Sequence, residues 1–272
     1  MPVDVDAVVL FNRRLSEDYN VVAVAAPGIA RQAQPGQFVM VKGAGDAPLL
    51  RRPFSVFEVL RDEAGQVTGL SLLNKRVGVT TRMLFGLRPG DRLRCLGPLG
   101  RPFAMAEPPQ EAWMVAGGVG LAPFATLAPA LRERRIETTL FYGGRSTSDL
   151  FHLDTFEQLG VSLRLTTDDG TRGEHGKVTV PLERALRETA ASQPVRLYAC
   201  GPTPMMRAVT ELAGSHGRPT EVSLEQVMGC GLGGCYSCVV SVRYDGGPAH
   251  FVRSCLDGPV FDGGAVVWDA LG

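Results

Sequence analysis

Four cysteines near the end of the chain have the spacing of an iron–sulfur ligand set. They follow the pattern C-x4-C-x2-C-x16-C and are Cys230, Cys235, Cys238 and Cys255. The spacing C-x4-C-x2-C with a later fourth cysteine is typical of plant-type [2Fe–2S] sites, in which four thiolates hold two irons. Glycines between the first two cysteines allow a loop to fold closely around a cluster and to turn backbone N–H groups toward its sulfurs. The pattern therefore predicts a [2Fe–2S] cluster on these four cysteines.

A structural zinc site and disulfide bonds are the alternatives to a cluster on these cysteines. A structural zinc site usually uses two short C-x2-C pairs, whereas this chain has one. Disulfides suit small secreted domains, but the chain is 272 residues long and its acidic start has no signal-peptide shape. We therefore favour the cluster over zinc or structural thiols.

The composition indicates a soluble globular protein, with 44% hydrophobic and 21% charged residues. The formal net charge is zero, which gives no general attraction to nucleic acid or to an anionic membrane. One stretch, Trp113–Leu131, carries no charge, but its glycines and prolines suit a strand, loop and helix better than a membrane span. We expect a cytoplasmic protein whose thiols stay reduced and free to bind metal.

Residues 1–105 have the pattern of an antiparallel β-barrel. Short apolar or alternating segments recur between Pro-Gly pairs and polar turns, with almost no helical periodicity apart from Thr80–Phe85. The predicted strands are Val5–Leu10, Tyr19–Ala25, Gln37–Val41, Phe54–Leu60, Gly69–Leu73 and Asp91–Leu96.

Two patches in this region could bind a nucleotide. Arg52-Pro53-Phe54-Ser55 offers a guanidinium for a phosphate and an aromatic ring that could cover a planar ring. Thr80-Thr81 opens the expected helix, where unpaired N–H groups and hydroxyls suit a diphosphate. Taken alone, the first patch is more often an ordinary strand edge and the second an N-cap. Together they carry weight only if a nucleotide-binding domain follows.

Residues 106–222 alternate strand-like and helix-like segments after the Pro108-Pro109 linker, which predicts a doubly wound parallel α/β domain. The predicted strands are Trp113–Ala116, Thr138–Tyr142, Ser162–Thr167 and Val195–Cys200, with Val222–Leu224 as a possible last strand. The predicted helices are Leu121–Arg134, Ser148–Leu159, Val180–Thr189 and Pro204–Ala213.

Two turns of this domain are candidates for binding a dinucleotide. Glycines after the first strand let the backbone approach a pyrophosphate at a helix N-terminus, and a later strand ends at the sheet edge where ligands bind. Taken singly, such a turn is moderate evidence, and a cysteine there could be a small buried apolar residue, as we expect for Cys95. The candidate residues are Gly117, Gly118, Gly120, Cys200, Gly201 and Pro202.

In this order the motifs resemble the ferredoxin–NADP reductase superfamily, and with the cysteine loop the chain resembles the electron transfer subunits of dihydroorotate dehydrogenase B (NAD+). The resemblance implies that FAD is held by Arg52, Pro53, Phe54, Ser55, Leu72, Leu73, Asn74, Thr80 and Thr81. Family members commonly have Gly-Thr where this chain has Thr80-Thr81. The distance between the backbone and the diphosphate could therefore differ here from that in other family members. The implied domains are 1–105 for FAD, 106–222 for NAD(H) and 223–272 for the cluster.

The resemblance also implies a function. Electrons would pass between NAD(H), FAD and the [2Fe–2S] cluster, to or from an FMN-containing dihydroorotate dehydrogenase catalytic subunit of pyrimidine biosynthesis, in a heterotetramer of two of each. We find no candidate proton-abstracting dyad or nucleophile, and no room for a (β/α)8 barrel of roughly 250 residues. The cysteine loop and Phe251–Phe261 would lie near the subunit contact.

Other functions share parts of this pattern. One is the flavin and iron–sulfur subunit of a ferredoxin-dependent NAD(P)H oxidoreductase or of a sulfide dehydrogenase. A free-standing oxygenase reductase and a redox sensor without hydride transfer are further alternatives. Arg145-Ser146 follows the second strand of the α/β domain, where a 2′-phosphate could be held, so NADPH is also open.

Overall fold

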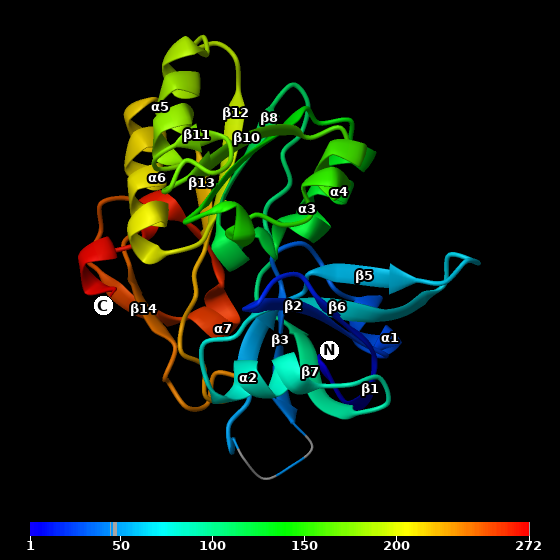
Figure 1. Ribbon diagram of the computed structural model, residues 1–272. Helices are drawn as coiled ribbons and strands as arrows, with labels where there is room; N and C mark the ends of the chain where they lie inside the picture. Colours follow the sequence, from blue (N-terminus) through cyan, green and yellow to red (C-terminus); the bar gives the residue numbers. More distant parts are fainter. Residues whose placement is uncertain (44, 46–47, 272) are drawn as a thin grey trace. The chain divides into compact units, whose positions relative to one another are not determined.

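The computed structural model describes residues 1–43, 45 and 48–271 (Figure 1). The chain divides into two compact units. The first comprises Met1–Pro102 together with Gln226–Val239 and Arg253–Pro259, and the second comprises Phe103–Glu225, Val240–Val252 and the residues from Val260 onward. The division into three domains at residues 105 and 222 stays a prediction.

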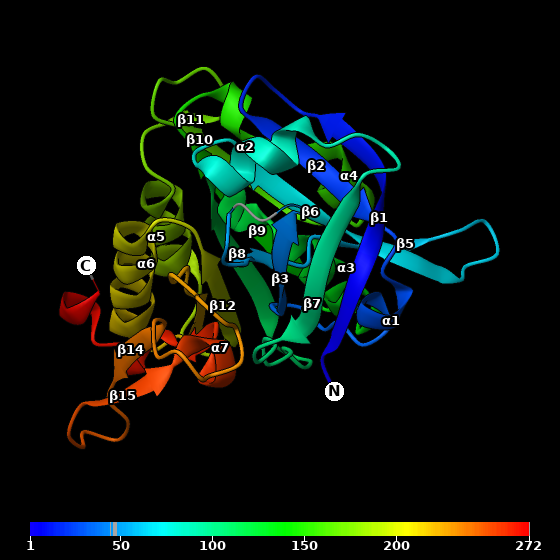
Figure 2. The same ribbon diagram turned by 90° about the horizontal axis from the view of Figure 1, so that it is seen from below.

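The first unit is built on an antiparallel sheet that forms a half-barrel. This confirms the predicted antiparallel β fold class of this region. Seven strands of the described residues pair in the order β4-β3-β7-β1-β2-β6-β5, and β1, β7 and β3 run side by side in Figure 2. The strands are β1 (Val3–Arg14), β2 (Tyr19–Val24), β3 (Phe38–Gly43), β4 (Arg52–Ser55), β5 (Glu58–Arg61), β6 (Val67–Lys75) and β7 (Arg92–Leu99). Helices α1 (Pro27–Ala30) and α2 (Val79–Gly86) complete it.

The prediction of one strand over Phe54–Leu60 was wrong, because the chain changes partners in the middle. The N–H of Val56 donates to the carbonyl of Gln37, beside β3, whereas the N–H of Phe57 donates to the carbonyl of Ser71 in β6. Both side chains are fully buried. The apolar run therefore continues through a break that only the long-range pairing reveals.

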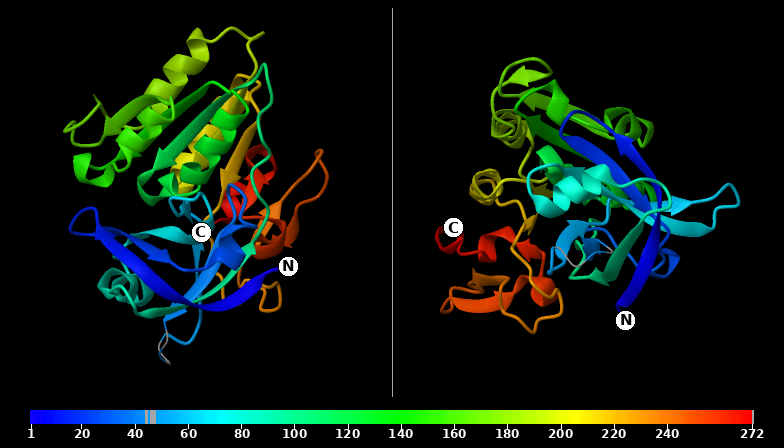
Figure 3. Two further views of the ribbon diagram at one scale, coloured as in Figure 1. Left: turned by 90° about the vertical axis from the view of Figure 1, so that its right-hand side faces the viewer. Right: turned by 60° about the horizontal axis from the view of Figure 1, so that its bottom comes forward.

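The second unit contains the predicted doubly wound parallel sheet. Its order is β11-β10-β9-β8-β12-β13-β16, and only β16 is antiparallel to its neighbour among the described strands. Helices α3 and α4 cover one face and α5 and α6 the other (Figures 1 and 3). The elements are β8 (Glu111–Gly117), α3 (Phe124–Glu133), β9 (Thr138–Gly144), α4 (Leu153–Gln158), β10 (Ser162–Thr167), β11 (Glu174–His175), α5 (Thr179–Glu188), β12 (Val195–Cys200), α6 (Thr203–Ser215), β13 (Thr220–Ser223) and β16 (Val260–Asp262).

Two predicted helices begin later than expected. Instead of starting at Leu121, α3 starts at Phe124, after the 3-10 turn η1 (Gly118–Leu121). The segment expected to be a helix from Ser148 contains the 3-10 turn η2 (Thr147–Asp149), followed by the short helix α4. His152 separates the two with a φ of 56°, and a left-handed residue cannot continue a right-handed helix.

The C-terminal residues add a hairpin of β14 (Val239–Val242) and β15 (His250–Arg253), helix α7 (Ser254–Asp257), and the 3-10 turns η3 (Gly263–Ala265) and η4 (Trp268–Ala270). Val240, Val242 and Val266 join the core of the second unit with Phe261. No helix within the described ranges combines the length and the apolarity needed to cross a membrane. The uncharged stretch Trp113–Leu131 forms β8, η1 and most of α3.

Candidate functional site

The four cysteines of the predicted cluster site all lie in the first unit and come together as two pairs. The Cys235 thiol has Cys230 as its thiol neighbour and the Cys255 thiol has Cys238, while Cys230 is also close enough to Cys255 to act on it electrostatically. In the described part of the chain no three His, Cys, Asp or Glu side chains surround a single metal position. Two thiolates on each of two irons is the ligand arrangement of a [2Fe–2S] centre. The donor set therefore fits such a cluster.

The two pairs differ in their surroundings. Cys238 and Cys255 are buried, whereas Cys235 is exposed and Cys230 half-buried. Hydrogen bonding to the Ser237 hydroxyl, followed by contacts with its backbone and with Cys230, lowers the pKa of the Cys235 thiol to about 6. Burial, reinforced by the neighbouring Cys238, raises the pKa of Cys255 to about 12. A cluster here has one pair of ligands near solvent and one in an apolar setting.

The cysteine loop packs on the half-barrel through a small apolar cluster. Its members are Phe38 and Met40 of β3, Leu99 of β7, and Met228, Cys238 and Cys255. Gly231 has a φ of 73° and lies against these apolar side chains, so that an added Cβ would be 2.5 Å from Met40 Cγ. The loop therefore needs glycine here for its left-handed backbone and for its contact with β3.

Hydrogen bonds hold the loop around the thiols. The Leu232 N–H donates to Cys230 Sγ at 3.3 Å, and the Ser254 N–H donates to the Cys238 carbonyl at 2.8 Å. Arg253 Nη1 donates to the Gly233 carbonyl at 2.9 Å, and its guanidinium lies 5.0 Å from the centre of the Tyr236 ring. A cation thus lies against the loop that carries the first three cysteines.

The residues predicted to hold FAD lie on β4, β6 and α2. Arg52, Pro53, Phe54 and Ser55 form β4, an edge strand, and all four are partly exposed. Arg52 Nη1 donates to the carbonyls of Leu50 and Arg51 at 3.3 and 3.0 Å.

On β6, the predicted residues Leu72, Leu73 and Asn74 are buried. They extend past β5, whose described pairing ends with Glu58 opposite Ser71. Among the described residues, no strand pairs with this part of β6 on that side. The leucine side chains point into protein, so what they offer a flavin is backbone.

Helix α2 is fixed by a ladder of three asparagines. Asn74 Nδ2 donates to Asn20 Oδ1 and Asn20 Nδ2 to Asn12 Oδ1, both at 2.7 Å. Asn12 Nδ2 then donates to the carbonyls of Leu84 and Phe85 in α2, both at 3.2 Å, and to that of Leu87 just after the helix, at 2.7 Å. At the other end, the Thr81 hydroxyl accepts the N–H groups of Val77 and Gly78 at 2.8 and 2.7 Å. The Thr81 hydroxyl is therefore engaged in the N-terminal turn.

The six residues predicted to bind NAD(H) are brought together at the carboxyl edge of the parallel sheet. Strands β8 and β12 are neighbours, with Ala116 opposite Cys200. An added Cβ on Gly120 would lie 2.1 Å from the Cys200 carbonyl oxygen, and one on Gly117 2.9 Å from Pro202 Cδ. The two turns touch backbone to backbone, which only glycine permits. Burial raises the pKa of the Cys200 thiol to about 12.

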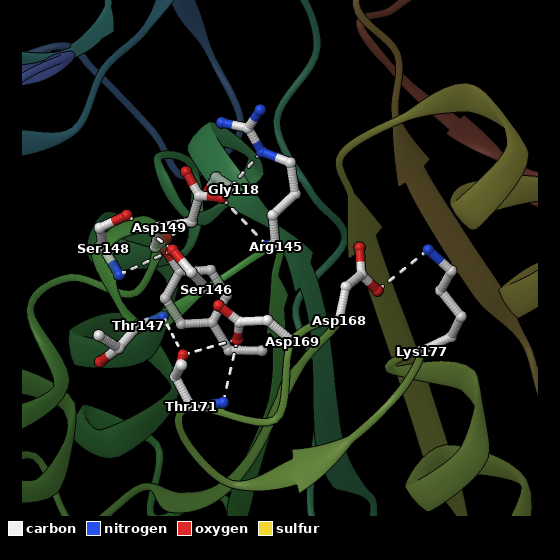
Figure 4. Close-up of polar contacts among 11 residues, drawn as sticks. Gly118, Arg145, Ser146, Thr147, Ser148, Asp149, Asp168, Asp169, Thr171 and Lys177 are labelled. Atoms are coloured by element: carbon white, nitrogen blue, oxygen red, sulfur yellow. Dashed lines mark hydrogen bonds and ion pairs between the residues drawn. The ribbon is translucent and has the colours of Figure 1, made fainter.

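The segment after β9 is held by polar contacts, shown in Figure 4. The Tyr142 hydroxyl lies 2.8 Å from the Asp149 carbonyl and 3.1 Å from the Gly118 carbonyl. Asp149 is buried and its carboxylate accepts the N–H and Nε of Arg145 at 3.0 and 3.1 Å. At the predicted 2′-phosphate position, Arg145 is thus already bonded to the Asp149 carboxylate. The Ser146 hydroxyl lies 2.7 Å from the Ser148 hydroxyl.

Some residues of these sites were not found from the sequence. Arg253, Asn12 and Asn20 act through tertiary contacts and belong to no motif, whereas Ser237 lies within C-x2-C. Tyr142 was predicted only as the last residue of a strand. A serine between the last two cysteines of C-x2-C is a signal that could have drawn attention to Ser237. Cys95, expected to be a small buried apolar residue, is indeed fully buried in the half-barrel core.

Two family models match the chain. Residues 225–267 match the iron–sulfur cluster binding domain of dihydroorotate dehydrogenase B. Residues 114–211 match the oxidoreductase NAD-binding domain. The chain thus contains an NAD-binding domain and an iron–sulfur cluster-binding domain.

Solved structures show the same architecture. A chain in the structure of an NADH-dependent reduced ferredoxin–NADP oxidoreductase, studied for flavin-based electron bifurcation, gives a TM-score of 0.85 at 31% identity. The match covers 98% of this chain and 91% of that one. A ferredoxin reductase in carbazole 1,9a-dioxygenase gives a TM-score of 0.68 at 24% identity, over 80% of this chain and 67% of that one, which shows the fold alone.

Similar sequences are named dihydroorotate dehydrogenase B (NAD(+)), electron transfer subunit. The protein of this name from Desulforamulus reducens is 38% identical over 90% of this chain and 90% of its own length. That from Geobacillus kaustophilus is 38% identical over 88% of this chain and 89% of its own length. With such identity along nearly the whole length, the chain belongs to the family of dihydroorotate dehydrogenase B electron transfer subunits, which are NAD-binding oxidoreductase components.

Proposed function

We propose that this chain carries electrons between NAD(H), an FAD on the half-barrel and a [2Fe–2S] cluster on Cys230, Cys235, Cys238 and Cys255, and exchanges them with an FMN-containing dihydroorotate dehydrogenase subunit. When bound, the flavin takes up hydride as two electrons and the cluster carries electrons singly. The observation that carries the proposal is that the four thiols gather within one unit, three of them on the glycine-rich loop and the fourth, Cys255, on α7.

Each set of residues has its own task in this proposal. The turns at Gly117–Gly120 and Cys200–Pro202 give the pyrophosphate of NAD(H) close access to backbone N–H groups. Arg52 supplies a cation for a flavin phosphate, and the N-terminal turn of α2, held in place by the Thr81 hydroxyl, supplies N–H groups. The proposed domains are 1–105, 106–222 and 223–272.

The surface around the cysteines supports a partner protein as electron acceptor or donor. Five large apolar side chains of the cysteine-bearing segments are exposed: Val227, Leu232, Tyr236, Val239 and Leu256. Such an exposed apolar group around a redox site fits a docking surface, and the family name implies a second subunit. In the predicted contact loop Phe251–Phe261, Phe251 is exposed whereas Phe261 is buried in the core. We propose that the catalytic subunit covers the five exposed side chains, in a heterotetramer of two of each.

Replacing one cysteine tests the cluster assignment. In Cys235→Ser, we expect loss of the visible absorbance and of the EPR signal of a reduced [2Fe–2S] centre, while flavin content is kept. Cys95→Ala is the matched control, because Cys95 lies in the half-barrel core away from the loop. A Cys235→Ser protein with a full cluster and undiminished NADH-to-partner transfer would show the assignment to be wrong.

The flavin assignment has a separate test. Arg52→Ala removes the proposed phosphate contact, and charge-assisted hydrogen bonds contribute about 1.5–3 kcal/mol. We therefore expect FAD affinity to fall at least tenfold, measured by fluorescence of the flavin released on dialysis. Arg61→Ala is the control, since Arg61 bonds the Gly65 carbonyl in the β5–β6 hairpin. Equal FAD retention in the two variants would remove Arg52 from the site.

A second candidate function is the flavin subunit of a ferredoxin-dependent NAD(P)H oxidoreductase. It is supported by the TM-score of 0.85 with a chain of the NADH-dependent reduced ferredoxin–NADP oxidoreductase structure. The higher identity to dihydroorotate dehydrogenase B subunits favours the first proposal. Co-purification separates the two: an FMN-containing, dihydroorotate-oxidising partner supports the first, and a ferredoxin-reducing partner the second.

A further inference from the structure

The hydroxyl of Ser237 occupies a defined place between two ends of the cysteine loop. The Gly229 N–H donates to Ser237 Oγ at 2.8 Å, and Ser237 Oγ lies 3.2 Å from Cys235 Sγ. A serine hydroxyl has one hydrogen to donate. Because its oxygen accepts from Gly229, and because a ligating thiolate carries no proton, that hydrogen is directed to the Cys235 sulfur.

The surroundings leave this hydroxyl little freedom. An added Cβ on Gly229 would lie 3.2 Å from Cys235 Sγ and 3.3 Å from Ser237 Oγ, so the three residues are packed together. Other hydrogen bonds to the cysteine sulfurs come from the backbone, that of Leu232 to Cys230 and those of Ser237 and Gly233 to Cys235 and Cys255. Ser237 is therefore the side-chain donor whose removal can be tested without changing the loop backbone.

We infer that Ser237 is a positioning residue of the iron–sulfur site, which fixes the Cys235 thiolate and raises the reduction potential of the cluster. The inference rests on the proposed [2Fe–2S] assignment. Hydrogen bonds to cluster sulfurs are among the features that set cluster potentials. They stabilise the more negative, reduced state, so the donor from Ser237 makes the site a better electron acceptor. Without it, the electron is less stable at this cluster.

The experiment compares variants of the full chain with reconstituted cluster. Ser237→Ala removes the donor, and Ser237→Thr keeps a hydroxyl at the same position. Tyr244→Phe is the control, because it removes a tyrosine hydroxyl from the β14–β15 hairpin, where the exposed Tyr244 ring lies against His250. Midpoint potentials are measured by EPR-monitored redox titration, alongside iron content and visible absorbance.

We expect a shift to more negative potential in Ser237→Ala, and wild-type potentials in Ser237→Thr and Tyr244→Phe. If Ser237→Ala fails to hold a cluster, restored cluster content in Ser237→Thr supports the positioning role, and failure of both variants contradicts it. A wild-type potential in a fully loaded Ser237→Ala overturns the inference. Absence of a [2Fe–2S] signal from the wild-type chain would instead contradict the proposed function, so the two failures are distinguishable.

Discussion

The cysteine loop and the η1 turn between β8 and α3 are both rich in glycine, yet they use it differently. In the loop, Gly231 and Gly233 have φ of 73° and 80°, and the nearest atoms to an added Cβ belong to the side chains of Met40 and Leu256. In the turn, the nearest atom to an added Cβ on Gly120 is the backbone carbonyl of Cys200, at 2.1 Å. Side chains can move, whereas the backbone of a central strand cannot.

This difference follows from what each segment binds with. The loop presents side-chain thiols, and its glycines shape the path between them. In the proposed NAD(H) site the turn presents backbone N–H groups, so the glycine itself would be the binding surface. We therefore expect the turn to be more sensitive to one added methyl group, and the loop to be more sensitive to one lost sulfur.

The largest effect is expected from Gly120→Ala. The added methyl group would overlap the Cys200 carbonyl, and overpacking costs about 1–3 kcal/mol or more. Relief requires the η1 turn to move away from β12, which separates the two halves of the proposed NAD(H) site. We expect KM for NADH in flavin reduction to rise at least tenfold, with FAD and cluster content unchanged.

Gly214→Ala is the matched control for that variant. Gly214 lies in α6 of the same unit, with no atom within 4 Å of an added Cβ, and alanine favours a helix by about 1 kcal/mol over glycine. Its KM for NADH should equal that of the wild type, with equal or higher thermal stability. Similar KM values for the two variants would mean that the backbone contact at Gly120 has no part in cofactor binding.

The same difference between side-chain and backbone contacts decides how much of each region could be predicted from the sequence. The cysteine ligands could be proposed because C-x4-C-x2-C is a local pattern of side chains. The glycine turn does not match G-x-G-x-x-G, and its contact with Cys200 joins residues 80 positions apart. The sequence could propose both turns but could not pair them, because strand order is set by long-range packing.

The wrong and missing strand predictions also arise because long-range pairing cannot be seen in a local sequence pattern. The break between β4 and β5 falls at Val56 and Phe57, two buried residues whose apolar pattern continues through it. Strand β16 was not predicted, because its three residues become a strand only by pairing with β13. The assignment of Gln226–Val239 and Arg253–Pro259 to the half-barrel unit likewise depends on contacts with β3 and β7.

A moderate effect is expected from Gly231→Ala in the cysteine loop. A left-handed conformation costs a residue with a Cβ about 1–2 kcal/mol, and the added methyl group would displace the Met40 side chain. We expect a protein that still binds the cluster but loses it severalfold faster to a chelator, followed by visible absorbance. Gly234→Ala, where an added Cβ meets nothing within 4 Å, is the control. If Gly231→Ala were as damaging to its site as Gly120→Ala, the distinction between side-chain and backbone contacts would fail.

The smallest effect is expected from Tyr142→Phe, which probes the glycine turn without adding volume. The phenol hydroxyl bonds the carbonyls of Gly118 and Asp149, and loss of such a bond costs about 1 kcal/mol. Because Gly118 belongs to the turn, part of that loss should appear as a rise of about threefold to fivefold in KM for NADH, at about 1.4 kcal/mol per tenfold.

Tyr198→Phe separates a local role from general destabilisation. The Tyr198 hydroxyl accepts the Ala106 N–H and lies 2.9 Å from the Ala104 carbonyl, away from the turn. Its removal should lower the free energy of unfolding by a similar amount, measured in urea, yet leave KM for NADH unchanged. Equal KM values for the two variants would reduce Tyr142 to a general contributor to stability. A rise confined to Tyr142→Phe would instead show that the turn depends on the hydroxyl behind it as well as on glycine.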